Sequence, residues 1–314
     1  MSLAGSLAAS LLATLARPAW WAMALAAFLI RGGILVVFLP IVALPTVAGL
    51  ANAFAPALVG FVFGGPSTAF IAAVAAIVLA ALAWLAVGGL VGAALDLALV
   101  RDAARDDDLE AGVRPGGGGP GRAFAVRLIA HLPTAAALGV GAVHLVEATY
   151  TELIHPGDPA LPVAARVVLR IPEIVALLAA TWLLGEAIGG LAVRHLAWGA
   201  SVPAAIGRAI RSLVRPSGVA TLIVTNAVLM ATIAGSAAAA AIAWDHLRIV
   251  LMDGGPANEA RLAILVFSLT WIAGLWLISL AVAWRSTAWT FEVGRRQAEV
   301  VPSPAAGTIE PHGP

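Results

Sequence analysis

The sequence has no cysteine and no lysine, and only 11% of its 314 residues are charged. A water-soluble domain carries roughly 25% charged residues, so the polar surface available here is too small to cover a soluble particle. The absence of cysteine excludes a disulfide framework, a thiolate metal site and a cysteine nucleophile. All 18 basic residues are arginine, which in a chain this rich in alanine and glycine is typical of GC-rich coding.

Reaction motifs are missing as well. The chain contains no HExxH, no GxSxG and no Walker A loop, so the usual metalloprotease, serine hydrolase and ATPase chemistries have no support. His131 and His144 lie on one expected span but point about 140° apart, so one facing helix cannot supply a haem ligand to both. We therefore expect no catalytic residue, no metal site and no cofactor, and nothing in the sequence indicates binding to nucleic acid.

Long hydrophobic runs are what the sequence has in abundance. Hydrophobic residues make up 61% of the chain, and they gather in six stretches, each as long as the roughly 20 residues that a helix needs to cross a bilayer. The prediction is an all-α, polytopic integral membrane protein, a bundle of six transmembrane helices within residues 20–300. The expected spans lie near 20–47, 69–97, 124–147, 170–193, 217–243 and 262–284.

The arginines predict the orientation of these spans. One side of the expected bundle has only Arg166, Arg170, Arg248 and Arg261 in its connections, and Arg31 lies within the first span. The remaining 13 of the 18 arginines lie on the side of the two termini. Basic loops resist translocation, so we expect both termini in the cytoplasm and the protein in the plasma membrane.

One segment between the spans has a defined pattern. In 201–216, Arg208, Arg211 and Arg215 share one helical face, so the segment is predicted to be an amphipathic helix at the cytoplasmic surface. That face suits anionic lipid headgroups, and the alternative is a helix that receives a cytoplasmic partner.

Four other segments lie outside the predicted spans. Residues 1–19 are predicted to form an interfacial segment, and the uncharged connection 50–67 is predicted to cap the bundle. The loop 101–122 combines acids with a Gly/Pro hinge and is predicted to be a solvated charge run. Residues 301–314 are predicted to be a disordered tail.

Three charges are candidates for functional groups inside the membrane, in the half nearest the cytoplasm, namely Arg31, Asp96 and Glu186. A bare charge at mid-bilayer costs at least about 2.5–3.5 kcal/mol, so we expect Arg31 to pair with Glu186 or with Asp96. Such a pair is interpreted either as part of a proton or substrate relay, or as a buried ion pair that sets helix register.

Small and weakly polar residues follow helical spacing near these charges. Gly88 and Gly92 form a GxxxG beside Asp96, and Gly185 and Gly189 form another around Glu186; such spacing lets helices approach closely. On the fifth span a polar seam is interpreted as a helix–helix contact or as the lining of a hydrophilic pathway. The seam consists of Thr221, Thr225, Thr232 and Ser236.

The leading hypothesis is a non-enzymatic, permease-like transporter subunit or accessory component. Its expected partners are the lipid bilayer and a cytoplasmic ATPase or other membrane subunits. One alternative is an intramembrane enzyme that acts on lipid or prenyl substrates through Glu186 or Asp96 with Arg31. Another is a structural or assembly protein. A water-accessible cavity shared by the three charges favours transport or catalysis, whereas sealed pairs favour the structural role.

The orientation is testable with reporter fusions. Alkaline phosphatase fused after residue 314 or within residues 107–116 should be inactive, because both sites face the cytoplasm, while green fluorescent protein at the same sites should fluoresce. A fusion after Asp253 should give the reverse pattern. Active phosphatase at either terminus would contradict the predicted orientation.

Overall fold

The computed structural model describes residues 3–38, 41, 64–65, 67–106, 117–155, 157, 163–254 and 256–300. Within these residues all regular secondary structure is helical, so the predicted all-α class is confirmed. The helices are α1 (Leu3–Ala16), α2 (Pro18–Phe28), the π-helical turn η1 (Leu29–Gly33), α3 (Ile34–Phe38), α5 (Thr68–Asp106), α6 (Pro120–Ala130), α7 (Leu132–Ile154), α8 (Val163–Leu169), α9 (Pro172–Ala197), α10 (Val202–Leu213), α11 (Pro216–Met252) and α12 (Ala257–Val300).

Six helical stretches in the described residues are long and apolar enough to cross a membrane, as predicted. The first combines α2, η1 and α3, and the others are α5, α7, α9, α11 and α12. Helices α11 and α12 are longer than their expected spans, with 37 and 44 residues. At 1.5 Å per residue these are about 55 and 66 Å long, so they tilt or project beyond a hydrocarbon core of about 30 Å.

Breaks in the chain divide two of the expected spans. In the first, Gly32 adopts a φ of 106° inside η1, a conformation open to glycine but strained for other residues, so Arg31 lies at a kink. The third, expected at 124–147, is divided at His131, with Pro133 in the first turn of α7. Proline suits the first turn of a helix because its missing N–H has no partner there, and Arg127 consequently lies on the separate helix α6.

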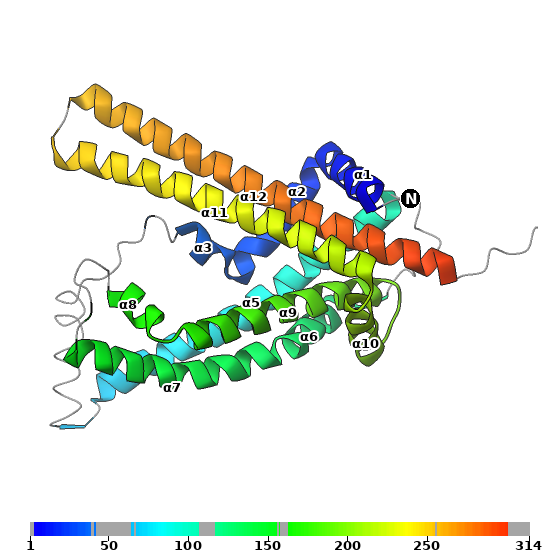
Figure 1. Ribbon diagram of the computed structural model, residues 1–314, viewed down its shortest axis with the longest axis horizontal. Coiled ribbons are helices and arrows are strands. Elements are labelled where there is room, and N and C mark those ends of the chain that lie inside the picture. The colour runs from blue at the N-terminus through cyan, green and yellow to red at the C-terminus, as the bar shows by residue number, and fades with distance from the viewer. Residues whose placement is uncertain are drawn as a thin grey trace, which may run out of the picture.

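The helices form two groups that meet at one end (Figure 1). Helices α11 and α12 make an antiparallel hairpin, while α6 and α9 pack together with α5 and α7 beside them. The first turns of α1, the short helix α10 and the last turns of α12 lie at the same end, which we call the terminal end. Arg295 of α12 donates a hydrogen bond there to Ser6 of α1. Both described chain ends therefore lie on one side of the bundle, as an even number of spans requires.

Close packing is concentrated in the half of the bundle nearest the terminal end. The largest cluster of buried apolar side chains joins α5, α6, α9, α10 and α12 around Leu97, Val126 and Leu196. Away from it, large apolar side chains lie on the surface, for example Ile77, which is 69% exposed, and Val146. Because water would not tolerate apolar surface on this scale, lipid is the solvent that these helices fit.

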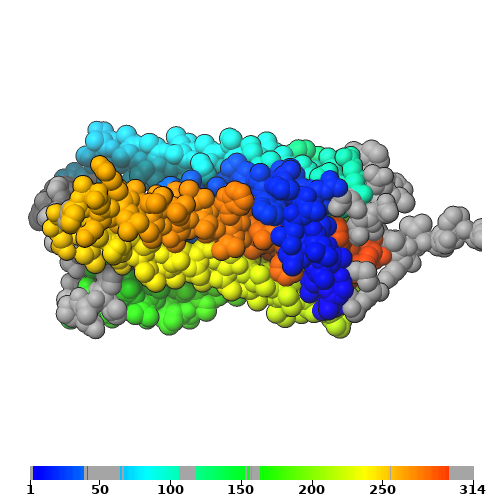
Figure 2. Space-filling model, turned by 90° about the horizontal axis from the view of Figure 1, so that it is seen from above, coloured from blue at the N-terminus to red at the C-terminus, as the bar shows by residue number. Residues whose placement is uncertain are grey.

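Helix α1 lies across α12 rather than along the bundle (Figure 2). Its buried residues are Ser6, Ser10 and Thr14, spaced four apart on one face, and Trp284 of α12 donates to the Ser10 hydroxyl at 3.1 Å. Leu12 on the other face is exposed. The helix therefore turns its polar face to the protein and its apolar face outward, which suits an interfacial position.

The opposite end is held by a separate set of charges. Glu152 near the end of α7 is buried, and its carboxylate lies 3.0 Å from Nε of Arg166 on α8 and 2.8 Å from Nε of Arg170 just after α8. The same carboxylate accepts the backbone N–H of Gly157. These contacts tie α8 and the start of α9 to α7, on the side where the sequence places few arginines.

Several expectations fall outside the described residues. The uncharged connection 50–67, apart from Gly64, Gly65 and Ser67, lies outside the described residues, and so do residues 107–116 of the acidic loop. The tail 301–314 and the part of the first expected span beyond Phe38, apart from Ile41, also lie outside the described residues.

The contact between α9 and α12 generates a stability prediction. A Cβ built on Gly190 would lie 2.6 Å from Cζ3 of Trp289, and that ring is held by a 2.9 Å hydrogen bond to Thr225. Gly190→Ala should therefore lower the free energy of unfolding by about 1–3 kcal/mol through overpacking, measured as thermal or denaturant unfolding in detergent. Gly235→Ala is the control, because its Cβ would meet no atom within 4 Å; equal effects of the two changes would contradict the packing.

Candidate functional site: an arginine-rich intramembrane cavity

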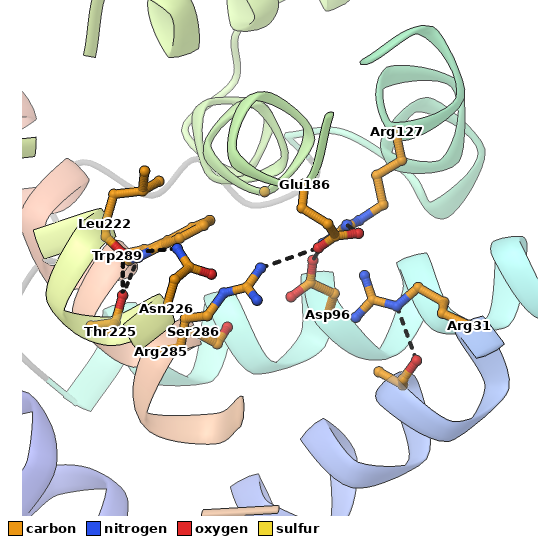
Figure 3. A network of polar contacts seen from close by, with 12 residues as sticks. Arg31, Asp96, Arg127, Glu186, Leu222, Thr225, Asn226, Arg285, Ser286 and Trp289 are labelled. Carbon is orange, nitrogen blue, oxygen red and sulfur yellow. Dashed lines mark hydrogen bonds and ion pairs between the residues drawn. The ribbon is translucent and has the colours of Figure 1, made fainter. Parts of the chain in front are cut away.

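Charged side chains from several separate helices meet between the two groups of helices (Figure 3). Nη2 of Arg127 on α6 lies 2.5 Å from Oδ2 of Asp96 on α5. Its Nη1 lies 3.4 Å from Oε1 of Glu186 on α9. The second oxygen of Glu186 lies 3.1 Å from Nη2 of Arg285 on α12. One chain of ion pairs thus connects α5, α6, α9 and α12.

Arg31 lies beside this chain but forms no ion pair among the described residues. Its Nε donates to the carbonyl of Ala27 at 2.9 Å, one turn earlier. The expected pairing with Glu186 or Asp96 is therefore not what the structure shows, and Arg127 is the arginine that contacts both acids. The reason is geometric, because α6 places Arg127 between α5 and α9, whereas Arg31 is held by its own helix.

The glycine pairs bring the backbones together at this point. A Cβ on Gly88 would lie 3.0 Å from the carbonyl oxygen of Ile30, and one on Gly92 would lie 2.8 Å from Cγ of Arg31. On α9, a Cβ on Gly185 would lie 2.9 Å from Cδ2 of His131, and Gly189 faces Arg127. Each GxxxG therefore serves a close helix contact next to an intramembrane acid, as such spacing permits.

A fourth arginine, Arg194 of α9, is buried and hydrogen-bonded without a carboxylate. It donates to the carbonyl of Gly190 at 2.5 Å, and to the carbonyl and hydroxyl of Ser286 at 2.9 and 2.7 Å. The guanidinium carbons of Arg194 and Arg285 lie 5.3 and 4.6 Å from the ring centroid of Trp289. Cation–π attraction at such distances stabilises partly desolvated arginines, so Trp289 supports two cations of the site.

These groups line a cavity of about 400 Å³ between η1, α9, α11 and α12. Its wall includes four arginines and two carboxylates, so two positive charges are left unbalanced. The arginines are Arg31, Arg127, Arg194 and Arg285, and the acids are Asp96 and Glu186. The three charges singled out in the sequence therefore share one cavity, and the surplus of arginine makes that cavity attractive to anions.

A second cavity, of about 210 Å³, lies on the far side of the same charges. Arg31, Arg127, Glu186 and Trp182 line both cavities, so these side chains form the wall between them. His131 lines only the second, with Nε2 3.5 Å from Oε1 of Glu186.

Sequence reasoning missed Arg127, His131, Arg194 and Arg285 as members of the site. Arg127 and His131 lie inside the expected span 124–147. Their position within an apolar stretch could have marked them as intramembrane polar groups. Arg194 and Arg285 each follow the last residue of an expected span, so they were counted as loop arginines. Hydropathy does not reveal that the helices continue past these residues and turn them inward.

The polar seam on α11 divides into two parts. Thr221 and Thr225 are buried, and Thr225 accepts the indole N–H of Trp289 on α12. Thr232 donates to the carbonyl of Val228 on its own helix at 2.8 Å, and Ser236 lies against Gly274 of α12. Two of the four seam residues, Thr225 and Ser236, therefore contact α12, and the role of the whole seam stays a prediction.

The basic helix lies apart from the cavity. Helix α10 buries Ala205, Ala209 and Ser212 against the bundle, whereas Ile210 is exposed. Arg208, Arg211 and Arg215 are exposed at the terminal end. Their contact with lipid headgroups remains a prediction.

Comparison with known proteins adds no relative. No protein-family profile, curated protein or solved structure matches the chain. In the described part of the chain there is also no group of three His, Asp or Glu side chains placed to hold a metal ion. The functional argument therefore rests on the charges and shape of the cavity.

The ion pair between Arg127 and Asp96 is testable by a double-mutant cycle. Arg127→Met should lower the free energy of unfolding by about 3–5 kcal/mol, because it leaves Asp96 as a buried charge with no counter-charge. Adding Asp96→Asn should recover more than half of the loss, measured by denaturant unfolding in detergent.

The control for this cycle is the exposed pair of Arg248 and Asp245 on α11. Arg248→Met should change the free energy of unfolding by less than about 1 kcal/mol. If the single Arg127→Met variant and the double variant were equally unstable, the pairing would be contradicted.

Proposed function

We propose that this chain is a permease-like, multi-pass protein of the plasma membrane that binds an anion in its arginine-lined cavity. Both termini lie in the cytoplasm in this proposal, following the arginine distribution. The observation that carries it is the charge of the cavity wall, where four arginines face two carboxylates. The surplus charge lies among apolar spans, where an uncompensated charge is costly, so an anionic ligand would be bound favourably.

Arg31 is the group best placed to hold that anion. Its Nε is occupied by a backbone carbonyl, and neither of its terminal nitrogens has a hydrogen-bond acceptor among the described residues. A guanidinium offers two parallel N–H donors to a carboxylate or phosphate. The stem of Arg31 is held against Gly92, so the head is positioned before a ligand arrives.

The enzyme alternative loses support from the same geometry. Asp96 and Glu186 were its candidate acid–base groups, and both carboxylates are already bound by arginine. A general base must be free to reach the proton that it abstracts. The ion pairs leave neither carboxylate free for that role.

The purely structural alternative also fits less well. A cavity of about 400 Å³ lies in the range of small-molecule sites, roughly 300–1,000 Å³. A charge cluster that served packing alone would be expected to be sealed in pairs. Here the paired groups share the wall with Arg31, which has no ion-pair partner among the described residues, and this favours a ligand over packing alone.

A transporter of this kind would work with other subunits. The chain has no Walker A loop, so in this proposal energy would come from a cytoplasmic ATPase or another membrane subunit. Helix α10, with three exposed arginines at the terminal end, would offer a basic surface to anionic headgroups or to such a partner.

Anion binding is testable with inorganic phosphate as the probe. Phosphate should raise the unfolding temperature of the purified protein in neutral detergent, saturably and beyond chloride at equal ionic strength, because a ligand that binds only the folded state stabilises it. At one hundred times the dissociation constant the gain is about 2.7 kcal/mol. Arg31→Gln should abolish most of this gain.

Arg248→Gln is the matched control, since Arg248 is exposed on α11 and lines neither cavity. It should leave the phosphate effect unchanged. A phosphate effect that survived Arg31→Gln, or one that chloride reproduced, would contradict the proposed site.

A further inference from the structure

The wall of the larger cavity changes from charged to apolar in one direction. On α12 the lining residues run from Arg285 and Ser286 to Val282, and on α11 from Asn226 to Leu229 and Ile233. Because α11 and α12 are antiparallel, both sequences run away from the terminal end. On η1 and α3 the lining likewise changes from Arg31 to Val36.

A shallow adjoining crevice, with a volume of about 20 Å³, continues the apolar part. A chain lying there would rest against its wall and would not be enclosed by it. Val36 and Ile233 line both the large cavity and this crevice, which is formed by α3, α11 and α12. Further along α12 its wall contains Ile278, Leu275 and finally Trp271. We call this apolar lining, from Val282, Leu229 and Ile233 through Ile278 and Leu275 to Trp271, the apolar track.

The apolar track extends about as far as one leaflet is deep. From Val282 to Trp271 the helix rises about 16 Å at 1.5 Å per residue. That is close to half of a hydrocarbon core of about 30 Å, the depth that one leaflet contributes. Phe38 of α3 lies 5.6 Å from Trp271, centroid to centroid, and Trp271 lies at the far end of the track.

We infer that the ligand of this cavity is an amphiphile, a lipid with a terminal phosphate monoester and an aliphatic chain. The inference rests on the proposed anion-binding function. The phosphate lies among the arginines, and the chain lies along the apolar track, pointing away from the terminal end. A lipid of the leaflet on the terminal side has this same orientation.

The charge of the wall selects the headgroup. Two positive charges are unbalanced, and a phosphate monoester carries about −1.5 to −2 charges at pH 7, with three strong acceptor oxygens. A carboxylate would leave one of the two charges uncompensated. A phosphocholine head brings a cation of its own, which the arginines would repel.

The apolar track selects the tail. A small hydrophilic anion would leave Leu229, Met230 and Ile233 in contact with water, whereas an aliphatic chain would remove that apolar surface from water. Beyond the track, the helices expose apolar side chains such as Ile242 on α11. A chain longer than the track would therefore continue into surrounding lipid.

Three probes in neutral detergent test the inference, with dissociation constants from titrations followed by thermal unfolding. They are lysophosphatidate with an 18-carbon chain, lysophosphatidylcholine with the same chain, and inorganic phosphate. Lysophosphatidate should bind at least tenfold more tightly than either of the others. Ile233→Trp, which fills the apolar track, should bring the ratio between phosphate and lysophosphatidate close to one.

Ile242→Trp is the matched control on the same helix. Ile242 is 72% exposed and lines none of the cavities described above, so this change should leave the ratio as in the unaltered protein. Arg31→Gln should weaken both phosphate and lysophosphatidate.

The outcomes separate the two proposals. Phosphate binding as tightly as lysophosphatidate would overturn the amphiphile and leave the anion site standing. Lysophosphatidylcholine binding as tightly as lysophosphatidate would overturn the assigned headgroup, and an unchanged ratio in Ile233→Trp would overturn the assigned position of the chain. Binding of none of the probes would overturn the proposed function together with this inference.

Discussion

The contact of one guanidinium with two carboxylates holds this structure together. Arg127 of α6 reaches Asp96 of α5 and Glu186 of α9, and Glu186 also binds Arg285 of α12. In an apolar environment each charge alone would be costly. The four helices must therefore keep the register in which these groups meet, and small residues such as Gly189 and Gly190 let α9 approach α6 and α12 closely.

The same cluster separates two kinds of surface. On its terminal side, side chains from α5, α6, α9, α10 and α12 are packed and buried. Toward the opposite end the helices expose large apolar side chains, which lipid would cover. The charges thus lie where a close-packed region meets a region whose helices depend on lipid, and the cavity occupies this boundary.

This position accounts for the mixed character of the cavity. Near the ion pairs its wall presents arginines and the indole of Trp289, and farther along α11 and α12 it is mostly aliphatic and aromatic, with Ser236 as a polar member. The charged groups that would bind a polar head and the apolar groups that would cover a chain follow one another along the direction of α11 and α12. An amphiphile is the class of molecule with this arrangement, and a membrane is where such molecules are concentrated.

Composition and hydropathy by themselves determined that the chain is helical and suited to a bilayer, because too few charges exist to cover a soluble surface and each apolar run is long enough to span. The spacing of Arg208, Arg211 and Arg215 likewise predicted a basic helical face. Only the tertiary structure decided that Arg127 and not Arg31 pairs with the acids, and that Arg194 and Arg285 turn inward. Ion pairing depends on which helices are neighbours and where each one kinks, and hydropathy along a single chain carries no information on either.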